Sequence, residues 1–173
     1  MRKLLFLNGF IVLANSANSL AQDWPRKPIR VICPFAPGGA TDIVARVFSQ
    51  HLQVALRQNV VVDNRGGAGG AIGAELAAKA EADGHTLLFS SDSPITIGPN
   101  LYKNTPYDPL KDFAPVGKVV SVVNVLVVNA KVKAANVGEL VKLAKQRQAT
   151  PMKFASSGAG AFGHLTGELF KAK

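Results

Sequence analysis

The sequence is poor in the residue types that build disulfide scaffolds and metal centres. It has one cysteine, Cys33, which excludes an intramolecular disulfide and a cluster of thiolate ligands. Its three histidines are far apart in the chain, which disfavours a histidine metal site. Aromatic residues make up only 7% of the 173 residues, but 47% are hydrophobic and 18% are charged. This balance is too apolar for a disordered chain and is typical of one globular domain.

Long hydrophobic runs are also missing. The apolar run at residues 4–14 is much shorter than the about 20 residues that a bilayer-spanning helix needs. It follows a basic start at Arg2 and Lys3 and precedes the small residues Ser19 and Ala21, which is the order of parts in a secretory signal peptide. The sequence therefore predicts a signal peptide at residues 1–21 and an exported mature chain. A buried N-terminal helix is the alternative interpretation.

Acidic residues are scarce in the last third of the chain. Residues 22–120 contain 10 Lys/Arg and 9 Asp/Glu, whereas residues 121–173 contain 8 and 2. The lysines are spread over predicted loops and helix faces and are not interleaved with aromatic residues as in many nucleic-acid-binding domains. We interpret them as solvated surface and expect no nucleic-acid partner. A basic nucleic-acid-binding domain remains a third possibility.

The mature chain does contain a regular alternation of short β-branched runs and amphipathic segments. Strands are predicted at residues 28–35, 60–62 and 86–89, with helices at 41–56 and 70–80 between them. Thr41 and Asp42 are expected to cap the first helix. Because strand–helix–strand units have right-handed crossovers, this order predicts an α/β fold with a parallel sheet.

The second half of the chain is less regular. Five prolines in residues 90–115 predict a long irregular connection with one short helix near Leu101. Beyond it we expect one or two strands at 116–128, an Asn136-capped helix to about 148, a strand at 152–155 and a last helix from His164.

Two glycine-containing loops each join the end of a predicted strand to the start of a predicted helix. Ligands bind at such positions in open α/β sheets, and a helix N-terminus favours an anion. One loop alone is explained as well by a tight turn, but two on successive units favour binding. Asp42 could instead accept an ammonium group or only cap its helix. The candidate ligand-binding residues are Phe35, Ala36, Gly38, Gly39, Ala40, Thr41 and Asp42 in the first loop, Ser156, Ser157, Gly158, Gly160 and His164 in the second, and Ser90 and Ser91 after the third strand.

The second loop also fits the pattern G-x-G-x-x-G, at Gly158, Gly160 and Gly163. An acidic residue about 20 positions later should hold a ribose, and only ten residues follow Gly163. This disfavours a dinucleotide site, and an exported nicotinamide-dependent oxidoreductase fragment is kept only as the alternative function. No catalytic residue is predicted, because Ser156 and Ser157 are not fixed within reach of His164 by their spacing.

Several ordered motifs resemble those of Bug-type receptors, the substrate-binding proteins of tripartite tricarboxylate transporters. They are KPIR at 27–30, PFAPGGATD at 34–42, VVDNRGGAGG at 61–70, ADGHTLL at 82–88, YDPLKDFAPV at 107–116 and ASSGAG at 155–160. The resemblance implies a two-lobed, hinged fold like that of type II periplasmic binding proteins. Family members are about twice the mature length, so we expect residues 22–120 to be a first lobe that lacks its return segment, and 121–173 the crossover and the beginning of a second lobe.

The resemblance also implies a function. The protein is expected to be a periplasmic receptor, and not an enzyme, that closes on a small mono-, di- or tricarboxylate without a metal or cofactor. The loop at 35–42 would hold one carboxylate, and Ser156 to Gly160 with His164 would hold the other end from the facing lobe. The expected protein partners are the membrane components of the transporter.

Overall fold

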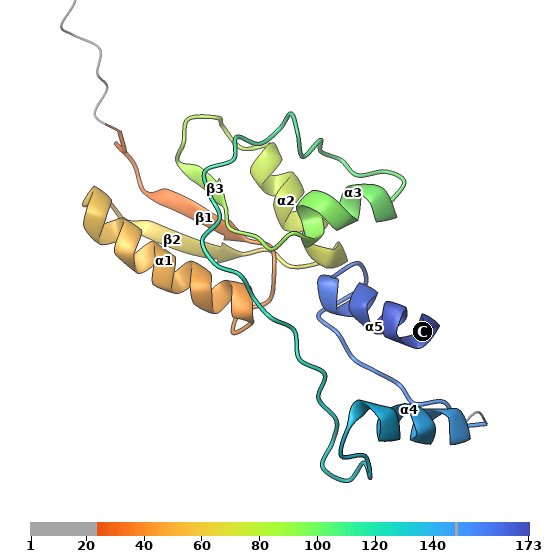
Figure 1. Cartoon of the computed structure of the whole chain (residues 1–173). Helices are drawn as coiled ribbons and strands as arrows, with labels where there is room; N and C mark the ends of the chain where they lie inside the picture. Colours follow the sequence, from red (N-terminus) through yellow and green to blue (C-terminus); the bar gives the residue numbers. More distant parts are fainter. Residues whose placement is uncertain (1–23, 148) are drawn as a thin grey trace, which may run out of the picture.

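The computed structural model describes residues 24–147 and 149–173 (Figure 1). The predicted signal peptide, residues 1–21, lies outside the described residues. Among the residues described, none of the helices is both long and apolar enough to cross a membrane.

The core of the molecule is a parallel sheet of three strands. These are β1 (Ile29–Cys33), β2 (Val60–Asn64) and β3 (Thr86–Leu88), in the order β2-β1-β3. The central strand β1 is the most apolar part of the core, since Ile29, Val31, Ile32 and Cys33 are fully buried. The predicted α/β fold with a parallel sheet is confirmed.

Helices cover both faces of this sheet (Figure 1). Helix α1 (Ala40–Leu56) packs on β1 and β2, and helix α2 (Ala71–Ala78) packs on β1 and β3 from the other side. Helix α2 comes very close to the end of β1. A Cβ atom at Gly73 would lie only 2.7 Å from Pro34 Cβ and from the Arg65 carbonyl oxygen, so only glycine fits at this position. The small residues of this helix therefore permit the close packing that the sequence suggests.

The proline-rich connection contains two short helical turns, of which the second matches the one short helix expected near Leu101. They are η3 (Ser93–Ile97), a single π-helical turn, and α3 (Gly98–Leu101). The buried Tyr107 hydroxyl donates a hydrogen bond of 2.6 Å to the Pro94 carbonyl and ties the connection to η3. A second short turn, η2 (Ala68–Gly70), leads from β2 into α2.

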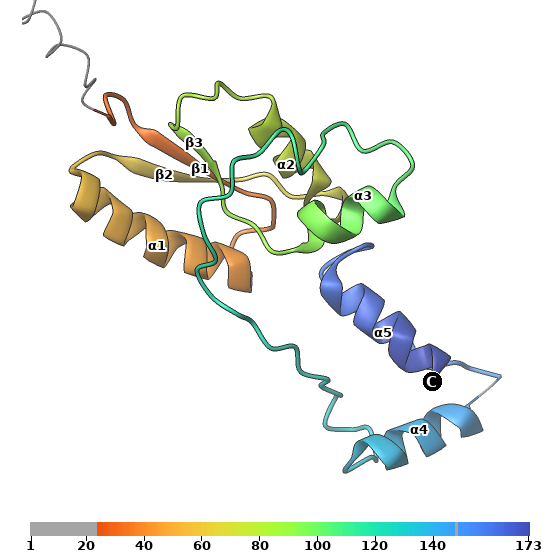
Figure 2. The same ribbon diagram turned by 45° about the horizontal axis from the view of Figure 1, so that its top comes forward.

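The last third holds two helices, α4 (Val137–Gln146) and α5 (Phe162–Ala172). The predicted start of α4 is confirmed, since the Asn136 side chain accepts the Glu139 N–H at 3.0 Å. Both views place α5 beside α3, whereas α4 lies away from the sheet (Figure 2).

The strands predicted at residues 116–128 and 152–155 are wrong for the described chain. Neither segment forms a strand there, and the apolar residues from Val119 to Val128 are exposed. A strand needs a neighbouring strand to exchange backbone hydrogen bonds, and no described segment is paired with either one. The β-branched composition of 116–128 is therefore not enough to make it a strand.

Candidate functional site

The first candidate loop lies where the central strand β1 passes into helix α1. Its backbone turns at Gly38, which has a φ of +80°, and the Gly39 N–H donates to the Ala36 carbonyl at 3.3 Å. Residues 36–40 are exposed, in contrast to the buried Pro34 just before them. A Cβ atom at Gly38 would meet nothing within 4 Å. The loop therefore presents open backbone to solvent.

Helix α1 begins without a side-chain cap. Its N-cap residue is Gly39, so the prediction that Thr41 and Asp42 occupy the cap is wrong by two to three positions. The first N–H groups of any helix lack intrahelical acceptors, and no hydrogen bond from the Ala40 or Thr41 N–H is found among the described residues. Free N–H groups at the positive end of a helix dipole are the kind of donors that anions accept, so the expected anion site at this loop stays a prediction.

Asp42 lies under this loop and organises it. Its carboxylate is 2% exposed, and Oδ2 accepts the Gly38 N–H at 2.8 Å and the Arg46 Nε–H at 2.9 Å. Its Oδ1 accepts the Asn64 amide at 2.8 Å. The Arg46 hydrogen bond, followed by those of Gly38 and Asn64, lowers the pKa of the Asp42 carboxyl from 3.8 to about 2. With both oxygens in use, Asp42 holds the loop in place.

Asn64, at the end of β2, completes this network. Its amide also donates to the Phe35 carbonyl at 3.1 Å, and its carbonyl oxygen accepts from Arg46 Nη2 at 3.0 Å. The ends of β1 and β2 and the start of α1 are therefore tied together by side chains that face one another at the carboxyl edge of the sheet.

Ser90 and Ser91 follow β3 at the same edge of the sheet. The Ser90 hydroxyl oxygen is buried and has no hydrogen-bond partner among the described residues. The Ser91 hydroxyl accepts the N–H of Ser93 at 3.3 Å, a local hydrogen bond just before the turn that follows. Ser90 therefore keeps a free hydroxyl at this edge, whereas Ser91 has a local structural role.

The second candidate loop, residues 156–164, is a compact turn at the start of α5. Gly158 and Gly160 have φ values of +127° and +77°, which only glycine adopts readily. The Gly160 N–H donates to His164 Nδ1 at 3.4 Å, so Nδ1 faces the loop backbone. The Ser156 hydroxyl lies 3.4 Å from the Gly158 nitrogen, and the N-cap residue of α5, Ala161, makes no side-chain cap hydrogen bond.

This second loop packs against residues from the first half of the described chain. The Tyr102 hydroxyl donates to the Ala159 carbonyl at 3.0 Å, and the buried Ser93 hydroxyl accepts the Phe162 N–H at 3.3 Å. A Cβ atom at Gly69 would lie 2.9 Å from the Ala159 oxygen, so the loop touches η2 directly.

Turn η2 also touches the first loop. A Cβ atom at Gly70 would lie 3.4 Å from the ring of Phe35. The two loops predicted from the sequence are thus brought to either side of η2, although they are more than a hundred residues apart in the chain. The structure adds Asn64, Gly69, Ser93 and Tyr102 to the residues that shape the site. The first two lie in the motif at 61–70, but nothing in the sequence indicates that Ser93 and Tyr102 face the second loop.

The described chain offers no metal centre at this edge. No group of three or more His, Cys, Asp or Glu side chains able to hold an ion is present in residues 24–147 and 149–173. Cys33 is buried, and burial is the main cause that raises the pKa of its thiol. The groups in the two loops that could bind a ligand are backbone N–H groups, hydroxyls and one imidazole.

Comparison with known proteins places the chain in a family. Residues 44–173 match the model described as "Tripartite tricarboxylate transporter family receptor". The chain is 44% identical to protein BugT of Bordetella pertussis over 176 residues, which cover 100% of this chain and 54% of BugT. The chain spans about half the length of the curated relatives it matches.

Solved structures agree with this match. A structure described as a periplasmic transporter has a TM-score of 0.80 and 46% identity, covering 86% of this chain and 50% of that one. R. palustris Rpa4515 with adipate also has a TM-score of 0.80, at 35% identity, and covers 86% of this chain and 49% of the other. The predicted likeness to two-lobed periplasmic binding proteins is therefore confirmed, with this chain corresponding to part of them. The chain belongs to the receptor family of the tripartite tricarboxylate transporters.

Proposed function

We propose that this chain forms the carboxylate-capturing part of a periplasmic receptor that delivers its ligand to a tripartite tricarboxylate transporter. The observation that carries this proposal is the uncapped N-terminus of α1, where no acceptor is found among the described residues for the Ala40 and Thr41 N–H groups and the loop is held by Asp42. Membership of the receptor family and the adipate in the similar Rpa4515 support the ligand class.

The arrangement of Asp42 favours an anion at the loop. A carboxylate side chain beside an anion site would repel the ligand. Here the Asp42 charge is buried beneath the loop and paired with Arg46 at 2.9 Å, so the charge closest to the ligand is the positive end of the helix dipole. One carboxylate of the ligand would accept the Ala40 and Thr41 N–H groups and the Thr41 hydroxyl.

The second loop would hold the other end of the ligand. The donors there would be the Ser156 and Ser157 hydroxyls and His164 Nε2, because the N–H groups of Gly158 and Gly160 already face Ser156 and His164 within the loop. Ser90, with its unpartnered buried hydroxyl, would contribute from the end of β3. A ligand that bridges two loops on different parts of the chain stabilises their closed arrangement, which a transporter can recognise.

The remaining expectations belong to this proposal. The protein would bind and release its ligand unchanged, as a receptor and not an enzyme, and would dock on the membrane components of the transporter from the periplasmic side. Residues 22–120 would be one lobe and 121–173 the crossover and start of the other, after a signal peptide at 1–21.

The test uses this chain joined to the part of BugT that it does not match, called the joined protein. Adipate should raise the melting temperature of the joined protein by mass action on its folded state. Ala40→Pro removes one proposed donor but suits the first position of a helix, and Gly39, with φ −74° and ψ 164°, has the extended conformation required before proline. We expect this variant to fold and to bind adipate about tenfold or more weakly, since a hydrogen bond to a charged group contributes about 1.5–3 kcal/mol.

Val137→Pro is the matched control. Val137 holds the same first position in α4, also after an extended residue, and α4 as a whole lies away from the sheet (Figure 2). Equal adipate affinity of the two proline variants would contradict a ligand contact at the first loop. Stabilisation by NAD and not by adipate would favour the oxidoreductase, and steeply salt-dependent binding to DNA would favour the nucleic-acid alternative.

A further inference from the structure

Residues 129–153 carry a strongly positive surface that lies outside the two candidate loops. This stretch contains six basic residues and one acidic residue. It comprises the turn before α4, helix α4 and the segment that follows it, and all six basic side chains are exposed. We call this stretch the basic segment; its basic residues are Lys131, Lys133, Lys142, Lys145, Arg147 and Lys153.

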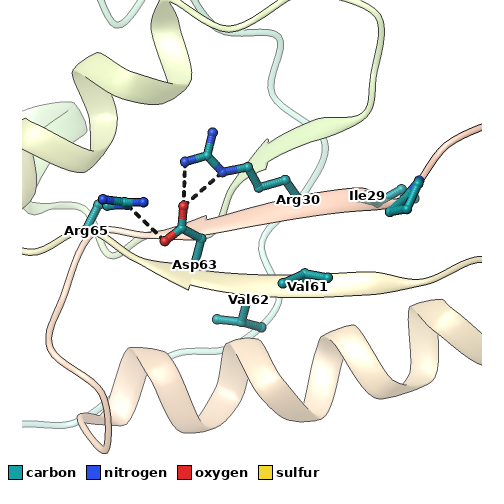
Figure 3. A pocket seen from close by; sticks show the side chains of 7 residues that line it. Ile29, Arg30, Val61, Val62, Asp63 and Arg65 are labelled. Carbon is teal, nitrogen blue, oxygen red and sulfur yellow. Dashed lines mark hydrogen bonds and ion pairs between the residues drawn. The ribbon is translucent and has the colours of Figure 1, made fainter.

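The basic residues of this segment differ from those of the first half in their partners. Six of the ten Lys/Arg between residues 22 and 120 form ion pairs with acidic side chains. Figure 3 shows one such group, in which Asp63 lies between Arg30 and Arg65. In the described part of the chain, none of the basic residues of the basic segment forms an ion pair.

The one acid of the basic segment, Glu139, is engaged at the start of α4. Its carboxylate accepts the Ala135 N–H at 2.8 Å and the Asn136 amide at 3.0 Å. These contacts hold Glu139 at the helix start, so most of the positive charge of the basic segment is left for a partner outside the described chain.

Helix α4 separates its lysines from its leucines. Residues two positions apart on a helix lie on nearly opposite sides. Leu140 and Leu143 are half-buried, whereas Lys142 and Lys145, each two positions further on, are exposed. The two lysines are three positions apart and so are neighbours on one face. Because α4 lies away from the sheet (Figure 2), this face is open to an approaching surface.

The composition of the basic segment fits a broad anionic surface better than a single anion or an acidic protein. Five of its six basic residues are lysines. Lysine presents a point charge without the fork by which arginine recognises one carboxylate or phosphate, and lysine is depleted at protein–protein interfaces where arginine is enriched. Clusters of about four to eight basic residues bind anionic lipid surfaces without a shaped pocket.

We propose that the basic segment is a docking surface for the anionic phospholipid headgroups of a membrane. Its use rests on the proposed function, because a receptor that delivers its ligand to a transporter has to reach the membrane that holds it. The attraction is screened beyond about 8 Å at physiological ionic strength, so it favours a loose association that still permits exchange.

The test measures binding of the joined protein to lipid vesicles by sedimentation. The protein is made from residue 22 onward, so that the apolar run at 4–14 does not contribute. One kind of vesicle contains only phosphatidylcholine, and the other also contains the anionic phosphatidylglycerol. We expect binding to the anionic vesicles alone, and its loss as salt is raised from about 0.01 M to about 0.15 M, since the Debye length falls from about 30 Å to about 8 Å.

Two variants with the same net charge locate the binding surface. Glutamine replaces lysine in both, because its helix propensity is similar. The first variant, which should bind anionic vesicles about tenfold or more weakly, carries Lys131→Gln, Lys133→Gln, Lys142→Gln and Lys145→Gln. The control variant loses four exposed lysines of the first half and should stay within about threefold of the unmodified protein; it carries Lys27→Gln, Lys79→Gln, Lys103→Gln and Lys111→Gln.

Each contrary outcome overturns the proposal. Equal weakening of the two variants would mean that net charge, and not the basic segment, causes the binding. Equal binding to neutral and anionic vesicles would exclude an electrostatic contact. Binding only to vesicles that hold the membrane components of the transporter would assign the basic segment to an acidic protein partner. None of these readouts depends on adipate, so failure here is distinguishable from failure of the proposed ligand site.

Discussion

At the scale of single residues, Asp42 shows what the local sequence can and cannot indicate. The sequence offers three roles for it: ligand contact, acceptor of an ammonium group, or helix cap. The structure places it below the loop, where it binds Gly38, Arg46 and Asn64 together. Arg46 is one helical turn away and could be foreseen, but Asn64 meets Asp42 only because β2 lies next to β1. The positioning role therefore depends on a contact between distant segments.

Replacing Asp42 by asparagine should change how stability depends on pH. The pKa of Asp42 is lowered from 3.8 to about 2 in the folded chain, so the ionised carboxylate stabilises the fold above pH 4. That contribution is lost as the pH falls from about 4 through 2. Asp42→Asn should therefore lower the melting temperature at pH 7, and the gap from the unmodified chain should narrow toward pH 2. A gap that stays constant between pH 7 and pH 2 would show that the Asp42 charge does not stabilise the fold.

Tyr102 should control how firmly the second loop is held. Tyr102→Phe removes the donor to the Ala159 carbonyl, and a hydrogen bond of this kind contributes about 0.5–1.5 kcal/mol. Amides at residues 158–164 should then exchange with deuterium roughly 2- to 10-fold faster, while β1 is unchanged. Tyr107→Phe loses a similar bond, to Pro94, and is the control. Faster exchange at residues 158–164 in that control as well would contradict a specific role of Tyr102.

At the scale of elements, local patterns predict the first half of the chain well. The strands at 28–35, 60–62 and 86–89 and the helices between them occur within a few residues of the predicted bounds, since their β-branched and amphipathic patterns agree with their packing. The segments at 116–128 and 152–155 have similar patterns but form no strands. Pairing is a contact with another segment, which the composition of a single segment does not reveal. For the same reason, the sequence does not predict that the second loop contacts Ser93 and Tyr102.

Two glycine-to-alanine changes separate packing from helix propensity. Gly73→Ala in α2 should destabilise the chain by about 1–3 kcal/mol, since the new methyl group would lie 2.7 Å from Pro34 Cβ and the Arg65 oxygen. Gly163→Ala in α5 meets nothing closer than 4.0 Å and should be neutral or stabilise by up to about 1 kcal/mol. Urea unfolding measures both. Stabilisation by Gly73→Ala would show that α2 does not approach β1 so closely.

At the scale of the whole molecule, packing is concentrated in the three-stranded sheet and its two helices. The fully buried apolar residues lie mainly in β1, with Ala45 of α1 and Ala74 of α2 on either side. Residues 116–128 and α4 contribute no buried residue, and Leu169 of α5 is 61% exposed. The first half of the chain therefore carries most of the free energy of folding, whereas the last third adds exposed apolar surface.

Hydrogen exchange along the whole chain should follow this division. Strand β1 is hydrogen-bonded to β2 on one side and to β3 on the other, so its backbone amides should be the most protected, followed by those of α1 and α2. Amides at 116–128 donate no backbone hydrogen bond and should exchange at nearly the rate of an unfolded peptide. Helix α4 should be only weakly protected, because a helix of about ten residues is marginal in water without a packed face.

Strong and uniform protection through α4 and α5 in a monomer would refute this division and show that residues 22–173 form one cooperative unit. If that protection appears only in the joined protein, the exposed valines at 116–128 are covered by the part of the family's length that this chain does not span.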